Sequence, residues 1–358
     1  MTANVSTATR LFILASVILL PAFRGGSGLA VQAAESSALA PPAVCARGTD
    51  ETRRLSKWGA RPYTVHLPPS YSRRVPLPVV IDIHGGGGNK EGARLTTCPD
   101  QDPDSPGCLD RLADCEGFIV VYPDGTQEPG QPKTIRSFNA GGGVNGYACI
   151  AGEACTADVD DVRFFGDLID ALKRQYRIDP NRVHVAGLSN GAAMSHRLAC
   201  ALSDRVASIA AVGGGNQYAT SGECAPGRSV PVLQIHGTAD RCFPYAGGHE
   251  RCTLLQPYGF RVSVADTVAG WVGRNGCRST PVVEAWADAD PDDGTTVTRM
   301  RYPDCSDGGD VTLLRVNGGG HTWPGGSDNL PDGIVGKVSR EFSANQVIWE
   351  FFKTHPLR

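Results

Sequence analysis

The stretch Arg182-Val183-His184-Val185-Ala186-Gly187-Leu188-Ser189-Asn190-Gly191 leads from a strand-like run into a helix-like run over residues 192–199. It contains the pattern G-x-S-x-G, which between a strand and a helix forms a nucleophile elbow that exposes the serine hydroxyl above a sheet. Glycine supplies 44 of the 358 residues, so the pentapeptide is informative only because of the strand and helix around it. The pattern predicts Ser189 as a nucleophile, followed along the chain by a carboxylate and then a histidine.

A carboxylate follows at the expected place. Asp240 comes just after a predicted buried strand over 230–235, in Ile235-His236-Gly237-Thr238-Ala239-Asp240. The ends of such strands are where active-site residues of α/β proteins collect. The alternative role for Asp240 is that of an Asx-type turn residue. We predict it as the catalytic acid, because the other acids of this region lie in polar stretches typical of solvent-exposed chain: Asp266, Asp288, Asp304, Asp307 and Asp310.

The predicted histidine is His321, which lies in a glycine-rich turn (316–326) directly after a predicted strand. The glycines let the backbone bend so that an imidazole can face Ser189. The chain has 8 histidines, and most of them are expected to be structural. His249 and His355 also follow the acid, but neither leaves a strand end inside a glycine-rich turn.

A glycine run after the strand over 78–84 predicts an oxyanion hole. His84-Gly85-Gly86-Gly87-Gly88-Asn89 matches the HGGG-type loop whose backbone N–H groups approach a substrate oxygen. The predicted donors are the backbone N–H groups of Asn190 and of Gly86 or Gly85, and His84 is expected to hold the loop. A flexible loop or a phosphate cradle is the alternative, but the P-loop and dinucleotide-binding patterns are absent from the sequence.

These residues together predict acyl transfer to water. His321 would remove the Ser189 proton, Ser189 would attack an ester carbonyl, and Asp240 would orient the imidazole. This chemistry requires no metal and no organic cofactor. The cysteines and histidines also lack zinc-binding spacing, so no metal site is expected.

The rest of the pattern alternates between strands and helices. Continuous β-branched runs at 78–84 and 118–122 are typical of strands buried on both faces of a sheet. Acidic residues between 158 and 161 precede apolar residues at helical spacing, which predicts a helix that ends near 177, and residues 179–181 are expected to turn the chain into the elbow strand. This alternation predicts an α/β fold with a mostly parallel sheet covered by helices on both faces. Further strands are predicted over 61–67, 206–212, 296–302 and 311–316, and a last helix over 341–352.

The composition limits the partners and the compartment. A net charge of -3 and a pI near 6.2 argue against a nucleic-acid partner. Arg10, an apolar run over 11–20 and a small-residue region predict a signal peptide over 1–34, with an uncleaved anchor as the alternative. Residues 35–44 are predicted to form a flexible leader and residues 45–358 a single catalytic domain. We expect a secreted protein, extracellular or periplasmic, with no stable membrane association after cleavage.

The 12 cysteines all follow the predicted signal, which favours disulfides formed in an oxidising compartment. Spacing suggests local pairs but does not determine them, because geometry decides which sulfurs meet. The suggested pairs are Cys98 or Cys108 with Cys115, Cys149 with Cys155, Cys200 with Cys224, Cys242 with Cys252, and Cys277 with Cys305.

Over residues 55–355 the chain resembles the secreted esterases of the polyhydroxybutyrate depolymerase and feruloyl esterase group, which are similar to carbohydrate esterase family 1. The resemblance implies an α/β-hydrolase fold with disulfide-stapled loops, the triad of Ser189, Asp240 and His321, and positions near the cleft for Asn139 and Trp323. The cysteines lie at other positions than in many members of the group, so their pairing is not carried over. The motifs that carry the resemblance are His84-Gly85, Ser137-Phe138-Asn139-Ala140-Gly141, Val159-Asp160-Asp161-Val162, Asp179-Pro180-Asn181-Arg182-Val183, the elbow, and His321-Thr322-Trp323-Pro324-Gly325.

The resemblance implies a small or oligomeric ester as substrate, first of all a feruloyl or acetyl ester of plant polysaccharide. A depolymerase of 3-hydroxybutyrate polyesters or oligomers is the alternative within the same chemistry. A serine exopeptidase and a non-catalytic carbohydrate- or lipid-binding protein are the alternatives outside it. Segments 86–116, 123–157 and 241–261 are expected to build the walls of the cleft and to set specificity.

Overall fold

The computed structural model describes residues 45–358, apart from 60, 150–151, 250–251, 253–258 and 329. The predicted signal peptide (1–34) and leader (35–44) lie outside the described residues. Both therefore stay predictions, as does the assignment of residues 45–358 to a single catalytic domain. No helix of the described part of the chain is both long enough and apolar enough to cross a bilayer.

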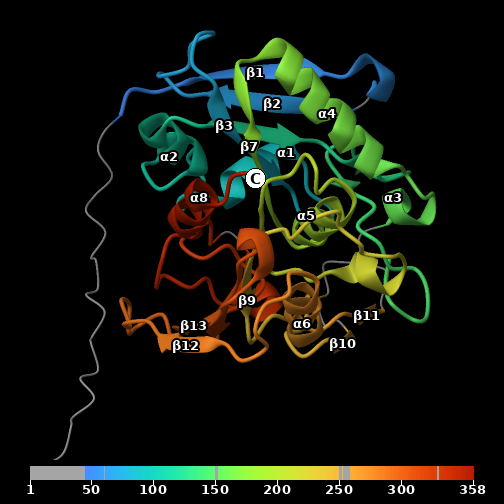
Figure 1. Cartoon of the computed structure of the whole chain (residues 1–358), viewed down its shortest axis with the longest axis vertical. Helices are drawn as coiled ribbons and strands as arrows, with labels where there is room; N and C mark the ends of the chain where they lie inside the picture. Colours follow the sequence, from blue (N-terminus) through green and yellow to red (C-terminus); the bar gives the residue numbers. More distant parts are fainter. Residues whose placement is uncertain (1–44, 60, 150–151, 250–251, 253–258, 329) are drawn as a thin grey trace, which may run out of the picture. The chain divides into compact units, whose positions relative to one another are not determined.

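A 10-stranded sheet forms the centre of the fold, with the strand order β1-β2-β4-β3-β7-β8-β9-β14-β13-β12 (Figure 1). The strands from β4 to β14 in this order are parallel to their neighbours, and antiparallel strands flank them at both edges. The prediction of a mostly parallel sheet is confirmed. The strands are β1 (Thr49–Arg54), β2 (Pro62–Leu67), β3 (Leu77–Ile83), β4 (Ile119–Pro123), β7 (Ile178–Leu188), β8 (Ile209–Val212), β9 (Val232–Gly237), β12 (Val282–Ala285), β13 (Thr296–Tyr302) and β14 (Val311–Asn317).

Helices cover both faces of this sheet, as predicted. α4, α5 and α6 pack on one face and α1, α2 and α8 on the other, with alternate strand residues buried beneath each set. In β3, for example, Val79 and Ile81 belong to the first core and Val80 to the second. The helices are α1 (Lys90–Thr96), α2 (Leu109–Glu116), α3 (Glu153–Thr156), α4 (Asp161–Gln175), α5 (Asn190–Ala201), α6 (Val264–Arg274), α7 (Asp332–Val335) and α8 (Ala344–Thr354).

Short elements lie in the connections between these strands and helices. Two further pairs of strands, β5 with β6 and β10 with β11, form small antiparallel sheets apart from the central one. Their bounds, with those of the 3-10 turns, are β5 (Thr126–Gln127), β6 (Arg136–Ser137), β10 (Gly248–His249), β11 (Phe260–Arg261), η1 (Ser56–Trp58), η2 (Gln217–Thr220) and η3 (Ser306–Gly308).

The helix before the elbow strand forms for the reasons seen in its sequence. Asp160 caps α4 by accepting a hydrogen bond from the Arg163 backbone N–H at 3.0 Å. Phe165 and Leu168 belong to its buried apolar face. The segment 179–181, however, does not turn the chain between separate elements. It lies inside β7, where the register with β3 shifts, so the strand bulges here instead of beginning afterwards.

The strand order reverses between β3 and β7. From β3 the chain passes to β4 on one side, and from β7 it passes through α5 to β8 on the other. Connections that leave in opposite directions open a crevice at the carboxyl ends of the two strands, which is where open α/β sheets bind ligands. The glycine loop after β3 and Ser189 after β7 both lie at this point.

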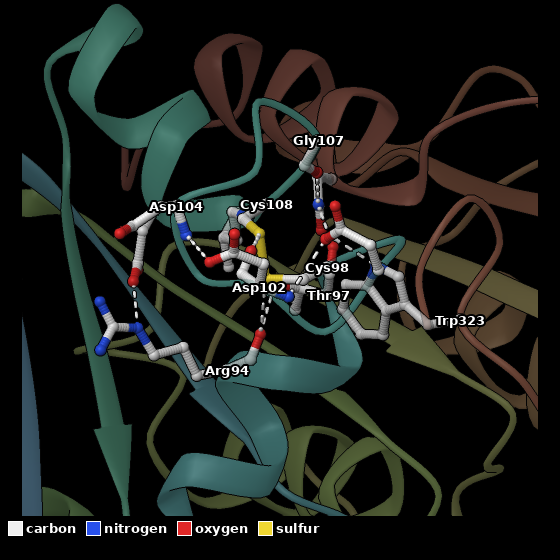
Figure 2. The surroundings of a disulfide bond; sticks show 12 residues. Arg94, Thr97, Cys98, Asp102, Asp104, Gly107, Cys108 and Trp323 are labelled. Carbon is white, nitrogen blue, oxygen red and sulfur yellow. Dashed lines mark hydrogen bonds and ion pairs between the residues drawn. A yellow bond between two sulfur atoms is a disulfide. The ribbon is translucent and has the colours of Figure 1, made fainter. Parts of the chain in front are cut away.

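All the cysteines are paired, and four of the suggested pairs are confirmed: Cys149–Cys155, Cys200–Cys224, Cys242–Cys252 and Cys277–Cys305. The suggestion that Cys98 or Cys108 joins Cys115 is wrong. Cys98 pairs with Cys108 (Figure 2), and Cys115 pairs with Cys45. Cys108 precedes α2 and Cys115 lies in it, so about 10 Å of helix separates them, which is more than a disulfide spans.

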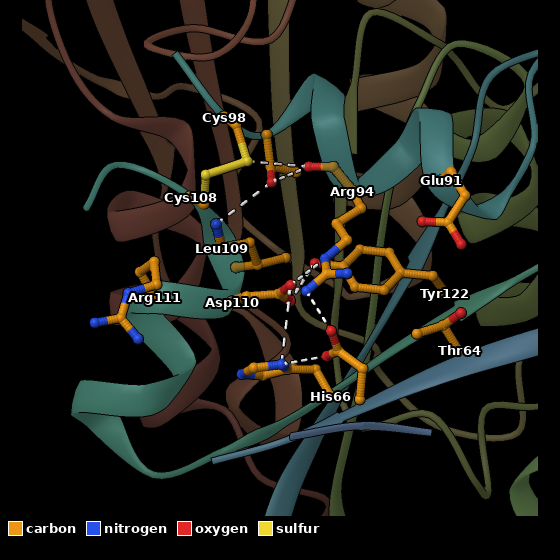
Figure 3. Close-up of polar contacts among 12 residues, drawn as sticks. Thr64, His66, Glu91, Arg94, Cys98, Cys108, Leu109, Asp110, Arg111 and Tyr122 are labelled. Carbon is orange, nitrogen blue, oxygen red and sulfur yellow. Dashed lines mark hydrogen bonds and ion pairs between the residues drawn. A yellow bond between two sulfur atoms is a disulfide. The ribbon is translucent and has the colours of Figure 1, made fainter. Parts of the chain in front are cut away.

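A buried polar cluster joins β1 and β2 to the helices on one side of the sheet. Figure 3 shows His66 and Arg94 on either side of Asp110. The two ring nitrogens of His66 face Asp50 at 2.7 Å and Asp114 at 2.9 Å. Burial lowers the pKa of His66, but the contact with Asp50 and the charges of Asp110 and Asp114 outweigh this effect and raise its pKa. The imidazolium therefore links β2 to β1 and to α2.

Candidate active site

Ser189 lies at the sharp turn between β7 and α5 with φ 60° and ψ -116°. Non-glycine residues rarely adopt a positive φ, and such strain clusters at functional sites. The Ser189 backbone N–H donates to the Val212 carbonyl at 2.9 Å, which ties the turn to β8. The glycines of the elbow are needed because β3 lies against it. A Cβ on Gly187 would lie 2.7 Å from the Ile83 carbonyl oxygen, and one on Gly191 would collide with the same atom.

The structure brings His321 and Asp240 together from the ends of β14 and β9. The Nδ1 atom of His321 lies 2.8 Å from Oδ2 of the buried Asp240 carboxylate. The other oxygen, Oδ1, accepts backbone N–H bonds from Cys242 at 2.8 Å and Phe243 at 2.7 Å. Burial raises the pKa of Asp240, but His321 and His236 outweigh it and lower the pKa to about 2. Asp240 is therefore an anion that holds the His321 proton on Nδ1 and leaves Nε2 as an acceptor.

Ser189 and His321 line one cavity of about 650 Å³. Within the described residues Ser189 Oγ makes no hydrogen bond, so the serine and the imidazole line the same cavity without a hydrogen bond between them. Catalytic hydrogen bonds of ligand-free enzymes are often long and shorten when substrate binds. Gly213 leaves room for the histidine, because a Cβ there would lie 3.3 Å from His321 Nδ1 at a φ of 59°.

The loop after β3 lines the same cavity through Gly85, Gly86 and Gly87. Gly85 lies so close to the nucleophile that a Cβ there would lie 3.4 Å from Ser189 Cβ. Gly87 and Gly88 donate to Arg136 and Gly85 carbonyls, whereas the Gly86 N–H donates to no group within the described part of the chain. This geometry suits the predicted role of Gly86 as an oxyanion donor.

His84 holds this loop in place. The Gly125 N–H donates to His84 Nε2 at 3.0 Å, so the ring proton lies on Nδ1 and is donated to the Gly85 carbonyl at 2.7 Å. Burial lowers the pKa of His84 to about 3, which keeps the ring neutral. The second predicted donor, the Asn190 backbone N–H, belongs to the first turn of α5, where the helix end carries partial positive charge.

Comparison with known proteins finds similarity to esterases. A family model described as phospholipase/carboxylesterase matches residues 157–266, which include the elbow and Asp240. The chain has the α/β-hydrolase fold. It is 30% identical over 208 residues to feruloyl esterase B of Piromyces equi, a match that covers 58% of this chain and 34% of the length of that protein. It is 27% identical over 297 residues to feruloyl esterase D of Neurospora crassa, covering 80% of this chain and 83% of the relative.

Among solved structures, an acetyl xylan esterase from Aspergillus awamori superposes with a TM-score of 0.48 at 17% identity, covering 77% of this chain and 94% of its own. The resemblance to the feruloyl esterase group, inferred from the motifs, is confirmed by the relatives in sequence.

Asn139, for which the family resemblance implied a position near the cleft, does not line the cavity. Its side chain is buried and donates to Asp158 Oδ1 and to the Val159 carbonyl, both at 3.1 Å, and its backbone N–H donates to Asp161 at 2.6 Å. The two motifs around Asn139 and Asp161 thus fasten the loop after β6 to the start of α4. Asn139 therefore holds this loop in place and does not enter the cavity.

Trp323 does not line the cavity either, although it lies two residues after His321. Its indole is 2% exposed and donates to Asn345 Oδ1 at 3.0 Å. The Asn345 amide in turn donates to the Thr97 and Gly107 carbonyls at 2.8 Å, and Figure 2 shows Trp323 beside this loop. Trp323 therefore joins the histidine turn to the disulfide-bonded loop and to α8.

The side chain of Asn190 has a supporting role that its position after the nucleophile does not reveal. Its Oδ1 accepts from the Phe138 N–H at 2.8 Å and its Nδ2 donates to the Phe138 carbonyl at 2.9 Å. The elbow and the loop after β6 are therefore fixed to each other. A sequence pattern cannot show this, because 52 positions separate the two residues.

The predicted wall segments supply part of the cavity. Gly86 and Gly87 come from the first segment, and Cys242 and Cys252 come from the third. Leu330 and Val335 also line it, although residues 326–340 carry no strand or helix pattern that would have indicated this. The second segment contributes Glu128, Pro129, Gln131, Ile135 and Gly152.

Among the residues that the structure describes, two groups of side chains have ligand atoms close enough to suggest a metal, and neither suits one. In Asp240, Cys242 and His321 the sulfur is already bonded to Cys252, so no thiolate is available. In the cluster of Asp50, His66 and Asp110 the cation is Arg94, which donates to both carboxylates. The donor atoms of both groups are thus already used within the protein.

Proposed function

We propose that this protein is a secreted serine-dependent carboxylic ester hydrolase that acts on feruloyl or acetyl esters of plant polysaccharide. The observation that carries the proposal is the pair of His321 and Asp240, 2.8 Å apart, at the cavity that also contains Ser189. The anchored carboxylate fixes the imidazole tautomer, and that tautomer leaves Nε2 as a base for Ser189, which lines the same cavity. A histidine in a purely structural role would not need an acceptor left open to a cavity.

Acylation follows from these positions. His321 Nε2 takes the proton of Ser189 Oγ as this oxygen bonds to the ester carbonyl carbon. The negative charge that develops on the carbonyl oxygen is stabilised by the backbone N–H groups of Gly86 and Asn190. Loss of one such donor typically lowers the rate about 10²- to 10³-fold. The carbon–oxygen bond to the alcohol then breaks, and the alcohol leaves with the proton from His321.

Deacylation repeats the steps with water. His321 Nε2 takes a proton from water, whose oxygen attacks the Ser189 ester, and returns it to Oγ as the carboxylic acid leaves. Asp240 stays ionised throughout, because its hydrogen bonds and the two imidazoles near it hold its pKa at about 2 despite its burial. It therefore stabilises the imidazolium that forms in both halves of the reaction.

The size and lining of the cavity support an acyl group larger than acetyl. A volume of about 650 Å³ lies within the range of about 300–1,000 Å³ found for small-molecule sites. Leu188, Ile135, Leu330 and Val335 offer apolar surface to an aromatic ring, and Glu128 and Gln131 offer polar groups. The relatives named feruloyl esterases favour the hydroxycinnamoyl esters over the alternatives.

The cysteines support the proposed secretion of the protein. Six disulfides are typical of proteins that fold in an oxidising environment, and reducing compartments do not maintain them. Their presence supports secretion, extracellular or periplasmic. Mass spectrometry of the mature protein from the culture medium tests this, since we expect an N-terminus near residue 35 and no free thiol.

A panel of substrates tests the proposed activity. It contains methyl ferulate, feruloylated and acetylated xylan oligomers, oligomers of 3-hydroxybutyrate, and an aminoacyl anilide. We expect turnover of the feruloyl esters at the highest kcat/KM, and loss of all turnover in Ser189→Ala. Preference for the hydroxybutyrate oligomers would show a polyester hydrolase, and anilide cleavage an exopeptidase. A folded protein that turns over no member of the panel would contradict the proposal.

A further inference from the structure

A continuous line of buried polar side chains lies beneath the catalytic acid. It begins at Trp271 on α6, passes through His196 on α5 and Gln234 and His236 on β9, and ends at Asp240. Each of these side chains is almost completely shielded from solvent. Burying so many polar groups is costly unless each finds a partner, and none of their side-chain nitrogen or oxygen atoms is without one in the described structure.

The first half of the line fixes the proton on His196. The Trp271 indole nitrogen can only donate, and it lies 2.9 Å from His196 Nδ1. His196 must therefore accept through Nδ1 and carry its proton on Nε2, which lies 3.0 Å from Gln234 Oε1. Burial lowers the pKa of His196 to about 4, so the ring is neutral at the pH of most secreted enzymes.

Gln234 determines which ring nitrogen of His236 carries the proton. The orientation of its amide is fixed by the Gly214 carbonyl, which can only accept and lies 3.0 Å from Gln234 Nε2. The same nitrogen lies 3.2 Å from His236 Nδ1, so this ring nitrogen accepts the second amide proton. With Nδ1 as the acceptor, His236 carries its proton on Nε2.

His236 Nε2 faces two acceptors of the catalytic acid and its loop. It lies 2.7 Å from the Phe243 carbonyl and 3.3 Å from Asp240 Oδ2, the oxygen that His321 also contacts. The Phe243 N–H in turn donates to Asp240 Oδ1 at 2.7 Å. His236 thus binds the Phe243 backbone, which holds Asp240 Oδ1, and lies close to Asp240 Oδ2.

We propose that His236 is a positioning residue of the active site, held as the Nε2–H tautomer by the line from Trp271, and that it aligns Asp240 with His321. This inference rests on the proposed function, because its effect is exerted through the catalytic acid. With His236 in this tautomer, its N–H holds the Phe243 carbonyl and lies 3.3 Å from Asp240 Oδ2, which favours the carboxylate orientation that faces the imidazole. A misplacement of about 1 Å at such a site can lower the rate about 10²-fold.

Three variants test the proposal. His236→Leu removes both ring nitrogens, whereas His236→Gln retains an amide donor close to the position of Nε2. Trp271→Phe keeps a ring but removes the indole proton that starts the line. The matched control is His184→Leu, since His184 is also fully buried in the sheet, on β7, but bonds to Ser208 and not to the catalytic acid.

We expect His236→Leu to lower kcat on methyl ferulate about 10- to 100-fold with KM nearly unchanged, and His236→Gln to recover most of this loss. In the wild type, ¹⁵N NMR of labelled histidines should show His236 protonated on Nε2 alone. In Trp271→Phe, His236 should no longer be held in one tautomer, so the spectrum should show a second one. This variant should also reduce kcat severalfold. His184→Leu should lower the unfolding midpoint and leave kcat unchanged.

The proposal would be overturned by a His236 proton on Nδ1, or by a folded His236→Leu variant with the kcat of the wild type. Equal losses of kcat in His236→Leu and His184→Leu would also overturn it. They would show that replacing any buried histidine of the sheet disturbs the site to the same extent. If His236→Leu does not fold, the tautomer spectrum and Trp271→Phe decide. Absence of wild-type turnover would refute the proposed function, while the NMR result does not depend on activity.

Discussion

Replacing Asp240 by asparagine changes the protons of the site without changing its shape. The asparagine can take only one orientation, because the Cys242 and Phe243 N–H groups both point at Oδ1 and need an acceptor there. Its NH2 group therefore replaces Oδ2 and faces His321 Nδ1, where the carboxylate of the wild type lies 2.8 Å away. Nδ1 then becomes the acceptor, and the imidazole proton moves to Nε2, toward Ser189.

This inverted tautomer cannot take the serine proton. Replacing the aspartate of a serine–histidine–aspartate triad by asparagine lowers kcat about 10⁴-fold. At about 1.4 kcal/mol for each factor of ten, this corresponds to about 5 kcal/mol of transition-state stabilisation. We expect a loss of this size for Asp240→Asn, with little change in KM because the cavity wall is intact.

The assay is the initial rate of methyl ferulate hydrolysis near neutral pH, with thermal unfolding as the test of folding. Asp110→Asn is the matched control, since Asp110 is also buried and hydrogen-bonded but lies in the cluster around Arg94. It should reduce stability and leave kcat unchanged. The reasoning about the tautomer would be refuted if a folded Asp240→Asn variant kept more than about a tenth of the wild-type kcat.

Three further predictions test other parts of the account. Gly213→Ala places a Cβ 3.3 Å from His321 Nδ1 at a φ of 59°, so we expect a stability loss of about 1–3 kcal/mol and a lower kcat, and an unchanged kcat would contradict the close fit. Because the pKa of His66 is raised in the folded protein, its stabilising contribution is complete below its ordinary value of 6.5 and is lost as the pH rises through the raised value. Denaturant titrations on the alkaline side should show a decline in unfolding free energy that His66→Gln lacks; equal slopes for both proteins would exclude the charged link. Trp323→Phe should cost about 1 kcal/mol through its lost bond to Asn345 and leave KM for methyl ferulate unchanged, whereas a changed KM would place the indole at the substrate.

The parts of the site that sequence predicts are those encoded by short stretches of chain. The elbow needs glycine on both sides of Ser189 because Ile83 approaches both positions, and this need is visible as a pentapeptide. Asp240 and His321 follow strands whose apolar runs mark their ends. The α/β class follows from buried strands alternating with a helix such as α4, which has an acidic cap and an apolar face.

The parts that sequence does not predict depend on contacts between distant positions. His236 looks like one more residue of a buried strand, and its role requires Trp271, which is brought close only by the packing of α5 and α6. The pairing of Cys115 with Cys45 requires the chain before β1 to pass beside α2, where Arg111 also donates to the Cys45 carbonyl. β1 itself is polar and mostly exposed, so no alternation of apolar residues reveals it.

The positions of Asn139 and Trp323 show that a residue of a family motif need not line the cavity. Both stand in segments that carry the resemblance, and both are buried hydrogen-bonding residues that fasten loops behind the cavity. A resemblance identifies positions that a fold requires, and it does not distinguish those that touch substrate from those that hold the loops in place.

The central claim is that Ser189 is a nucleophile activated by His321, and a fluorophosphonate probe tests it most directly. After the folded protein reacts with the probe, peptide mass spectrometry should find a single modification, on Ser189. Ser189→Ala should not be labelled, and His321→Ala should be labelled far more slowly. Failure of the folded wild type to react, or a modification on any other residue, would contradict the account.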